Sequence, residues 1–192
     1  MEREQIVTYL NGSFQINPPL QGIHLGYLDR FSRIRHMKRD VKLLKKLRDP
    51  LREAVGLPLG LEGAYYVAGE IFFSDYDNPT IIEYNDPPSG QPRLWCSWEA
   101  SGDGESYYWT NGDKNYGHVA WLEYLIKHFL NPWHYKLSGR VECENYFCKY
   151  ISPDGDEEEN EVEIPYVEKS ELIIKDDNIV IENALGTFRD ER

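Results

Sequence analysis

Residues 91–142 read QPRLWCSWEASGDGESYYWTNGDKNYGHVAWLEYLIKHFLNPWHYKLSGRVE, and they contain all five tryptophans of this 192-residue chain. Residues 94–99 and 105–110 are aromatic runs that flank an SGDG turn, a pattern that predicts a β-hairpin. Apolar side chains recur at helical spacing over residues 115–130, and residues 133–143 alternate between apolar and polar. These elements predict an α+β fold, in which a mostly antiparallel sheet packs against one central helix.

The predicted helix and the strand after it have recognisable ends and faces. Asp113 or Asn115 is suited to cap the start of the helix, and Pro132 marks its end. The alternation in the strand predicts one buried face and one wet face. The buried face would hold Trp133, Tyr135, Leu137, Val141 and Cys143, and the wet face His134, Lys136, Ser138, Arg140 and Glu142.

Other segments with strand patterns lie on both sides of this stretch. Residues 6–10 fit either a short strand or a helical turn, and Asn17-Pro18-Pro19 ends any regular element. Runs rich in aromatic and β-branched residues predict further strands. These runs cover residues 65–73, 80–84, 146–151, 162–167, 172–175 and 179–182, and the last two form a predicted hairpin.

A basic segment precedes the aromatic part of the chain. Between Asp29 and Glu53 the sequence has ten Lys/Arg and four Asp/Glu. Apolar residues at spacings of three and four predict an amphipathic helix over residues 27–50, with the cations on its opposite face. Glycines and prolines near residue 60 suggest the end of an N-terminal extension, so the predicted domains are 1–60 and 61–192.

Composition restricts the class of protein. The net charge of −12 argues against general nucleic-acid binding by the main domain, because phosphate would be repelled. No apolar run is long enough to span a membrane, and no secretory signal is visible at the N-terminus. The three cysteines lack metal-ligand spacing, so we expect free thiols in a reducing cytoplasm and no metal or other cofactor.

Carboxylates and aromatic residues occur together in the predicted hairpin. Glu99 and Glu105 lie near Trp98 and Trp109 in the sequence, as a general acid and base beside stacking rings would in a sugar-cleaving enzyme. An acidic hairpin over a tryptophan-filled core has the same sequence pattern. The first interpretation is a small hydrolase that uses Glu99 or Glu105, and the second assigns no catalytic residue.

Other catalytic patterns are weak. His118 and His128 are ten residues apart on one predicted helix, so they cannot form the i, i+4 pair of a helical metal site. Cys96 has no histidine nearby in the sequence, and no phosphate-binding or nucleophile motif occurs. These observations favour a protein that is not an enzyme.

The tryptophan-containing stretch also carries a motif, QPxLWCxW followed by WLEYLIxxFLxPWxYxLxGxVE. With it the chain resembles a family of small bacterial and phage proteins that has no assigned activity, so the resemblance implies a fold but no function. The match departs from the family pattern at His134, where glycine is expected, and in the acidic insert. The matching residues are Gln91, Pro92, Leu94, Trp95, Cys96, Trp98, Trp121 to Ile126, Phe129, Leu130, Pro132, Trp133, Tyr135, Leu137, Gly139, Val141 and Glu142. The resemblance extends to the final hairpin through Ile173, Ile174, Lys175, Asp177 and Asn178.

The favoured function is a non-enzymatic binding protein, such as an inhibitor, an immunity-type protein or a phage antagonist. Its acidic and aromatic surface would dock a basic protein partner, with charge steering the encounter and aromatic rings acting as anchors. Nucleic acid or an anionic surface could be reached only through the basic segment at residues 29–53. The expected contact residues are Trp98, Asp103, Glu105, Tyr107, Tyr108, Asp156, Glu157 and Glu158.

Overall fold

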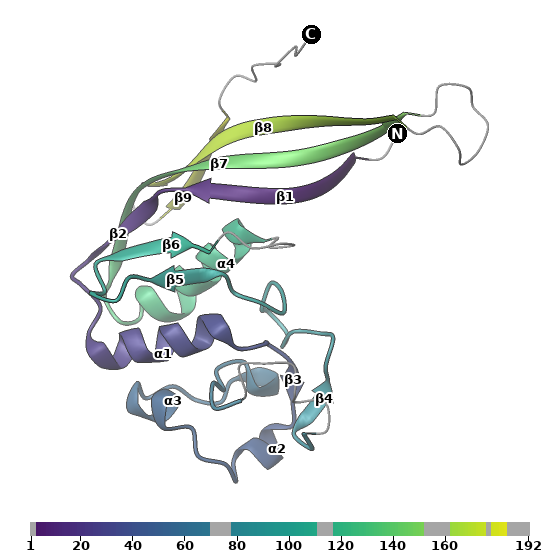
Figure 1. Ribbon diagram of the computed structural model, residues 1–192. Coiled ribbons are helices and arrows are strands. Elements are labelled where there is room, and N and C mark those ends of the chain that lie inside the picture. Colours follow the sequence, from purple (N-terminus) through teal and green to yellow (C-terminus); the bar gives the residue numbers. More distant parts are fainter. Residues whose placement is uncertain (1–2, 70–77, 111–116, 152–161, 176–177, 184–192) are drawn as a thin grey trace.

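The computed structural model of the protein describes residues 3–69, 78–110, 117–151, 162–175 and 178–183 (Figure 1). It confirms an α+β fold with a mostly antiparallel sheet. The elements are β1 (Arg3–Asn11), β2 (Ser13–Asn17), α1 (Gly22–Arg33), β3 (Lys38–Arg39), α2 (Val41–Leu44), α3 (Pro50–Ala54), a 3-10 turn (Leu61–Gly63), β4 (Ile81–Glu83), β5 (Trp98–Ala100), β6 (Ser106–Trp109), α4 (His118–Leu125) continued by a π-helical turn (Ile126–Leu130), β7 (Lys136–Ile151), β8 (Val162–Lys175) and β9 (Asn178–Asn183).

The main sheet has the strand order β5-β6-β2-β7-β8-β9, and β1 pairs with β7. After an irregularity between Gln5 and Val7, β1 and β2 pair with β7 in one register, with Asn11 opposite Glu142 and Gln15 opposite Ser138. Gly12 separates the two strands at a φ of 114°, in a backbone region that glycine occupies without a Cβ clash. β1 and β2 therefore pair one after the other with the same edge of β7. β6 pairs with the other edge of β2.

The hairpin predictions are confirmed, although several strands are longer or shorter than expected. β5 and β6 pair with Trp98 opposite Trp109, and β8 pairs with β9. The segments predicted as separate strands at 133–143 and 146–151 form the single strand β7, and those at 162–167 and 172–175 form β8. Figure 1 shows β1, β7 and β8 extending together beyond the helices at one end of the molecule.

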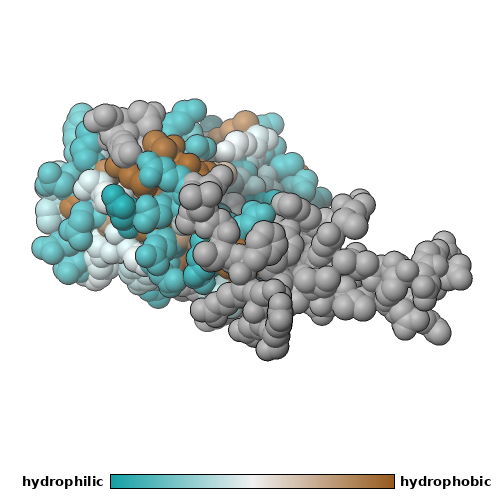
Figure 2. All heavy atoms as spheres, turned by 90° about the horizontal axis from the view of Figure 1, so that it is seen from above, coloured by the Kyte–Doolittle hydropathy of each residue, from teal (hydrophilic) through white to brown (hydrophobic). Residues whose placement is uncertain are grey.

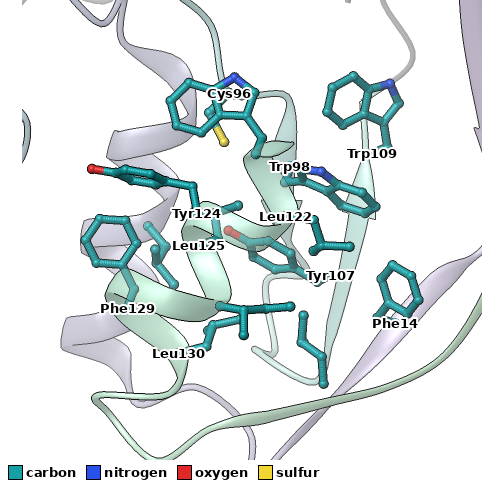
Figure 3. Packing of buried hydrophobic residues seen from close by; sticks show 14 of the residues in the cluster. Phe14, Cys96, Trp98, Tyr107, Trp109, Leu122, Tyr124, Leu125, Phe129 and Leu130 are labelled. Atoms are coloured by element: carbon teal, nitrogen blue, oxygen red, sulfur yellow. The ribbon is translucent and has the colours of Figure 1, made fainter. Parts of the chain in front are cut away.

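Large aromatic side chains fill the space between the sheet and the helices. Trp98, Trp121, Tyr107 and Phe129 are all fully buried. Figure 3 shows residues of α4 packed against those of the hairpin. Burying one such side chain contributes about 1.5–3 kcal/mol, so this aromatic cluster is the main source of stability in the body of the fold.

The central helix reaches Leu130, the end that Pro132 predicted, but its cap and its last turn differ from the prediction. Its N-cap is Gly117, at a φ of 87°, without a side-chain cap, while Asp113 and Asn115 lie outside the described residues. At its far end the Asn131 N–H donates to the carbonyl of Ile126, five residues back, at 2.9 Å. The wider turn leads into the bend before β7.

The long basic helix was a wrong prediction, because α1 ends at Arg33. Tertiary hydrogen bonds then replace helical ones: the N–H groups of His36, Lys38 and Asp40 donate to the carbonyls of Leu94, Asp86 and Thr80. The Asp40 carboxylate caps the separate helix α2. The apolar stripe was nevertheless informative, since five of its members are buried: Leu28, Phe31, Ile34, Met37 and Leu44.

The strand predicted at 65–73 is absent from its described part, residues 65–69, and residues 70–73 lie outside the described chain. Turn hydrogen bonds hold this segment instead. The N–H groups of Tyr65 and Tyr66 donate to the carbonyls of Leu59 and Gly63. The next amide, that of Val67, donates to the buried Asp49 carboxylate at 2.9 Å. A β-rich composition is overridden here by local turn geometry.

The predicted boundary near residue 60 does not separate two hydrophobic cores. β2 lies between β6 and β7, and Phe14, Tyr27 and Phe31 belong to the same cluster as Trp98. The first 60 residues are thus an integral part of the fold rather than an extension. The reason is that β7 offers a long edge, which β1 and β2 complete from the start of the chain.

Candidate functional site

The predicted binding hairpin places two of its expected contact residues, Trp98 and Tyr107, in the core. Trp98 is 0% exposed and Tyr107 is 1% exposed. Their rings stack at 6.1 Å and 5° (Figure 3). The expectation that they anchor a partner at the surface is therefore wrong, because period-two alternation in β5 and β6 turns them inward.

The polar residues of the hairpin lie on its outer side. Asp103 and Glu105 are exposed, and Tyr108 is half-buried. The Asp103 carboxylate accepts hydrogen bonds from the Ser101 hydroxyl at 2.5 Å and from the Glu105 N–H at 3.0 Å, which together lower the pKa of Asp103. Asp103 therefore stays ionised and organises the turn. The predicted contacts Asp156, Glu157 and Glu158 lie outside the described residues.

The alternative catalytic pair occupies two different environments. Glu99 is half-buried on β5 and accepts a long hydrogen bond, 3.5 Å, from the Tyr108 hydroxyl. Glu105 is exposed at the turn. A glycosidase acid is normally held protonated by burial or by a neighbouring carboxylate. Solvent exposure of Glu105 does not supply that environment, so this geometry does not favour the hydrolase.

A second acidic surface, which the sequence analysis did not single out, lies across the long sheet. Glu142 on β7 is directly opposite Glu171 on β8, and Glu171 is directly opposite Glu182 on β9. Glu142 and Glu182 are exposed, and the Glu171 side chain is 31% exposed. We call these three residues the acidic row. Its members are far apart in sequence, so only the strand register brings them together.

Two tyrosines lie beside the acidic row on the same face. Tyr9 on β1 is 40% exposed, and its ring meets that of Tyr146 edge to face at 5.5 Å. The Tyr146 hydroxyl donates to the Glu144 carboxylate at 3.1 Å, and this hydrogen bond raises the pKa of Tyr146. We call Tyr9 and Tyr146 the tyrosine pair. The face thus offers aromatic area at low conformational cost beside negative charge.

Cations lie among the glutamates of this face. Arg140 contacts Glu171 at 3.2 Å, and Lys169 pairs with Glu144. Like charges directly opposite in a sheet destabilise it by roughly 0.2–1 kcal/mol per pair. The directly opposed pair of Glu142 and Glu171 is therefore unfavourable for the isolated chain. Figure 2, seen from above, shows hydrophilic residues over most of the described surface, with smaller hydrophobic areas between them.

The side chains of Cys96 and Cys143 are buried and form no disulfide. Burial raises the pKa of the Cys96 thiol to about 12. The Cys143 Sγ lies 3.8 Å from the Nε2 of His118, but burial raises the pKa of Cys143 and lowers the pKa of His118. A neutral thiol beside a neutral imidazole lacks the charge separation of an activated nucleophile. Both cysteines are best explained by packing.

Two other histidines, His24 and His128, take part in aromatic clusters. His24 stacks on Trp133 at 4.1 Å and its Nδ1 is 2.8 Å from the Tyr135 hydroxyl. His128 stacks on Tyr124 at 4.2 Å and its Nδ1 is 2.9 Å from a second phenol, that of Tyr65. Within the described ranges, no group of three or more His, Cys, Asp or Glu side chains could hold a metal ion.

Many cations of the basic segment are used inside the fold. Arg30 donates to the carbonyls of Val67 and Gly69. Arg35 donates to the Tyr84 carbonyl at 3.2 Å and lies over the Tyr84 ring. These contacts support the interpretation of the segment as structural for its first half. In its second half the cations are exposed to solvent instead, namely Lys42, Lys45, Lys46 and Arg48.

The comparisons with known proteins identify no relative: no family model, curated protein or solved structure matches this chain. The resemblance on the tryptophan motif therefore stays a prediction. Across the described part of the chain, the helices are too short or too polar for any of them to traverse a bilayer.

Proposed function

We propose that this chain is a non-enzymatic binding protein that docks a basic protein partner on the outer face of β1, β7, β8 and β9. The acidic row and the tyrosine pair would form the contact. This is the type of recognition used by inhibitors, immunity-type proteins and antagonists, which block a partner through charge and aromatic anchors.

The observation that carries the proposal is the acidic row itself. Glu142, Glu171 and Glu182 oppose one another across three strands, and the like charges of Glu142 and Glu171 directly opposite each other lower the stability of the free chain. Cations of a partner placed above the row would remove this repulsion. Tyr9, with 40% of its surface exposed, would then be covered by the same partner.

The face is also mechanically suitable for docking. It is built on paired strands rather than on loops. Backbone hydrogen bonds therefore fix the strands from which its side chains project. The Tyr146 ring is further held by its contact with Tyr9 and by its hydrogen bond to Glu144. Pre-ordered side chains lose little entropy on binding, which favours affinity.

The test is capture of a partner by the immobilised chain, followed by titration with matched variants. The double variant E142Q/E182Q removes two charges from the acidic row, and Y9A removes the exposed ring. The control E83Q/E123Q removes two exposed charges elsewhere and gives the same net charge. Captures are made with nuclease at about 0.1 M and 0.5 M salt, because surface charges are screened over about 10 Å at the lower value.

We expect one basic protein in stoichiometric amount, bound more weakly at higher salt. Its affinity should fall at least tenfold with E142Q/E182Q and with Y9A, and stay within twofold for the control. A partner that binds all four proteins equally well, or that is indifferent to salt, would contradict the proposal.

A further inference from the structure

The turn between α2 and α3 is the most basic exposed part of the described chain. Four cations occur within seven residues, and all four are exposed: Lys42, Lys45, Lys46 and Arg48. Of the described residues, none forms an ion pair with any of these four side chains. The flanking acids are already occupied, since Asp40 caps α2 and Asp49 is buried beneath Arg52. We call residues 42–51 the basic turn.

Exposed apolar side chains accompany these cations. Leu47 is 45% exposed and Leu51 is 38% exposed. Leu51 lies against α1, where its Cδ2 is 3.8 Å from the position that a Cβ would take at Gly26. One turn earlier on α1, Ile23 is 50% exposed. Three branched aliphatic side chains thus stand in solvent beside the four exposed cations.

The combination of exposed cations and exposed aliphatic side chains favours one kind of anionic partner over another. Phosphate-binding surfaces of nucleic-acid proteins pair cations with polar and aromatic side chains, which contact backbone and bases. Aliphatic side chains flanked by Lys and Arg instead fit the boundary between headgroups and acyl chains in an anionic bilayer. The aliphatic residues therefore distinguish between the two kinds of anionic partner.

We propose that the basic turn binds the surface of anionic membranes, with the lysines against lipid headgroups and Leu47, Leu51 and Ile23 at the acyl boundary. Figure 1 shows α2 and α3 at the opposite end of the molecule from β1, β7 and β8. A chain bound in this way would present the acidic row away from the membrane. The strongly negative remainder of the chain is then also held at a distance from the anionic surface.

The experiment is co-sedimentation of the full-length chain with vesicles of phosphatidylcholine, either alone or with about one third phosphatidylserine. Two variants change the basic turn: K45E/K46E reverses two charges, and L47Q/L51Q removes apolar area. The control R93E/K127E makes the same change in net charge at two exposed cations elsewhere. Circular dichroism verifies that each variant is folded.

We expect binding only to the vesicles that contain phosphatidylserine, with strong weakening at about 0.5 M salt. A basic residue near an anionic surface contributes roughly a fivefold factor in partitioning, so K45E/K46E should lower it by at least about 25-fold. L47Q/L51Q should lower it several-fold, and R93E/K127E much less than K45E/K46E.

Several outcomes would overturn the inference. These are absence of binding, equal binding to neutral vesicles, or equal loss with R93E/K127E. Preferential binding of duplex DNA or RNA through the same lysines would assign the basic turn to nucleic acid. Concentration-dependent dimers lost in both K45E/K46E and E142Q/E182Q would instead identify the acidic face of a second copy as the occupant. We expect the variants of the acidic row to bind membranes as the unchanged chain does. A negative result in the vesicle experiment would therefore leave the proposed partner binding standing, and a negative partner capture would leave the membrane proposal standing.

Discussion

At His134 the backbone has a φ of 64°, in the left-handed region that side chains with a Cβ adopt only at a cost. The residue is exposed in the bend between the π-helical turn and β7, where its N–H donates to the Asn131 carbonyl at 3.0 Å. The bend is required to direct the chain into the sheet. Glycine would occupy this conformation without strain.

We therefore expect H134G to increase the free energy of unfolding by about 0.5–1 kcal/mol, after the entropy cost of glycine is subtracted. Urea unfolding of the two proteins measures the difference. H134A serves as control, because alanine retains the Cβ and should bring no gain. Equal stabilisation by H134A would show that the imidazole, rather than the backbone, is the source of the effect.

A second residue-scale feature is the buried imidazole of His36, which is 3% exposed and packs on Phe31 at 4.4 Å and Trp121 at 5.0 Å. Burial lowers the pKa of His36 to about 3. The unfolded chain binds a proton below its ordinary value near 6.5, whereas the folded chain does not. Stability is therefore present above pH 6.5 and is lost as the pH falls toward 3.

This linkage predicts a loss of about 1.4 kcal/mol per pH unit between pH 6 and pH 4 from His36. Urea unfolding at several pH values measures the slope. H36Q removes the titration and should flatten the curve in this window by about that amount, even though its stability at neutral pH is lower. Parallel curves for the two proteins would show that His36 does not remain neutral in the folded chain.

At the scale of elements, strand register decides which charges meet. The acidic row sets Glu142 against Glu171 across β7 and β8, and Arg140 forms an ion pair with Glu171 beside them. If this pair serves binding, a substitution that removes the repulsion should raise the stability of the free chain and lower its affinity for the partner.

We predict that E142Q raises the free energy of unfolding by about 0.2–1 kcal/mol while it weakens partner binding. The gain should shrink in 1 M salt, where the screening length is about 3 Å. Urea unfolding at low and high salt checks this, with E123Q on α4 as the control that changes the same charge without an opposed neighbour. A loss of stability in E142Q would show that the glutamate is favourably paired in the free chain.

At the scale of the whole molecule, the first 60 residues complete the sheet and the core. They contribute β2 between β6 and β7, and Phe14, Tyr27 and Phe31 to the aromatic cluster. Asp49 also holds the amide of Val67 from this part of the chain. An N-terminal extension that could be removed without loss of folding would make none of these contacts.

Deletion of residues 1–60 is accordingly expected to prevent cooperative folding. The truncated chain should lack a sigmoidal urea transition and show tryptophan emission at the wavelength of exposed indole, because Trp98 and Trp121 lose their covering residues. A truncated chain with native-like emission and a cooperative transition would restore the division into an extension and a domain.

The sequence alone determined the pieces that depend on local pattern. Alternation in residues 133–143 predicted which face of β7 is buried, because successive side chains of a strand point to opposite faces of the sheet. The aromatic runs around SGDG predicted the hairpin. The α+β class follows from the same signals. The apolar stripe of the basic segment likewise named residues that are buried, although not their conformation.

Only the tertiary structure decided where those pieces end and what they place together. Leu94, Asp86 and Thr80 provide the carbonyls that end the helical path after Arg33, and no local signal announces such distant acceptors. The same limit applies to the candidate site. Glu142, Glu171 and Glu182 meet through strand register, which depends on pairings between segments far apart in the chain, so composition could indicate an acidic protein but not its acidic row.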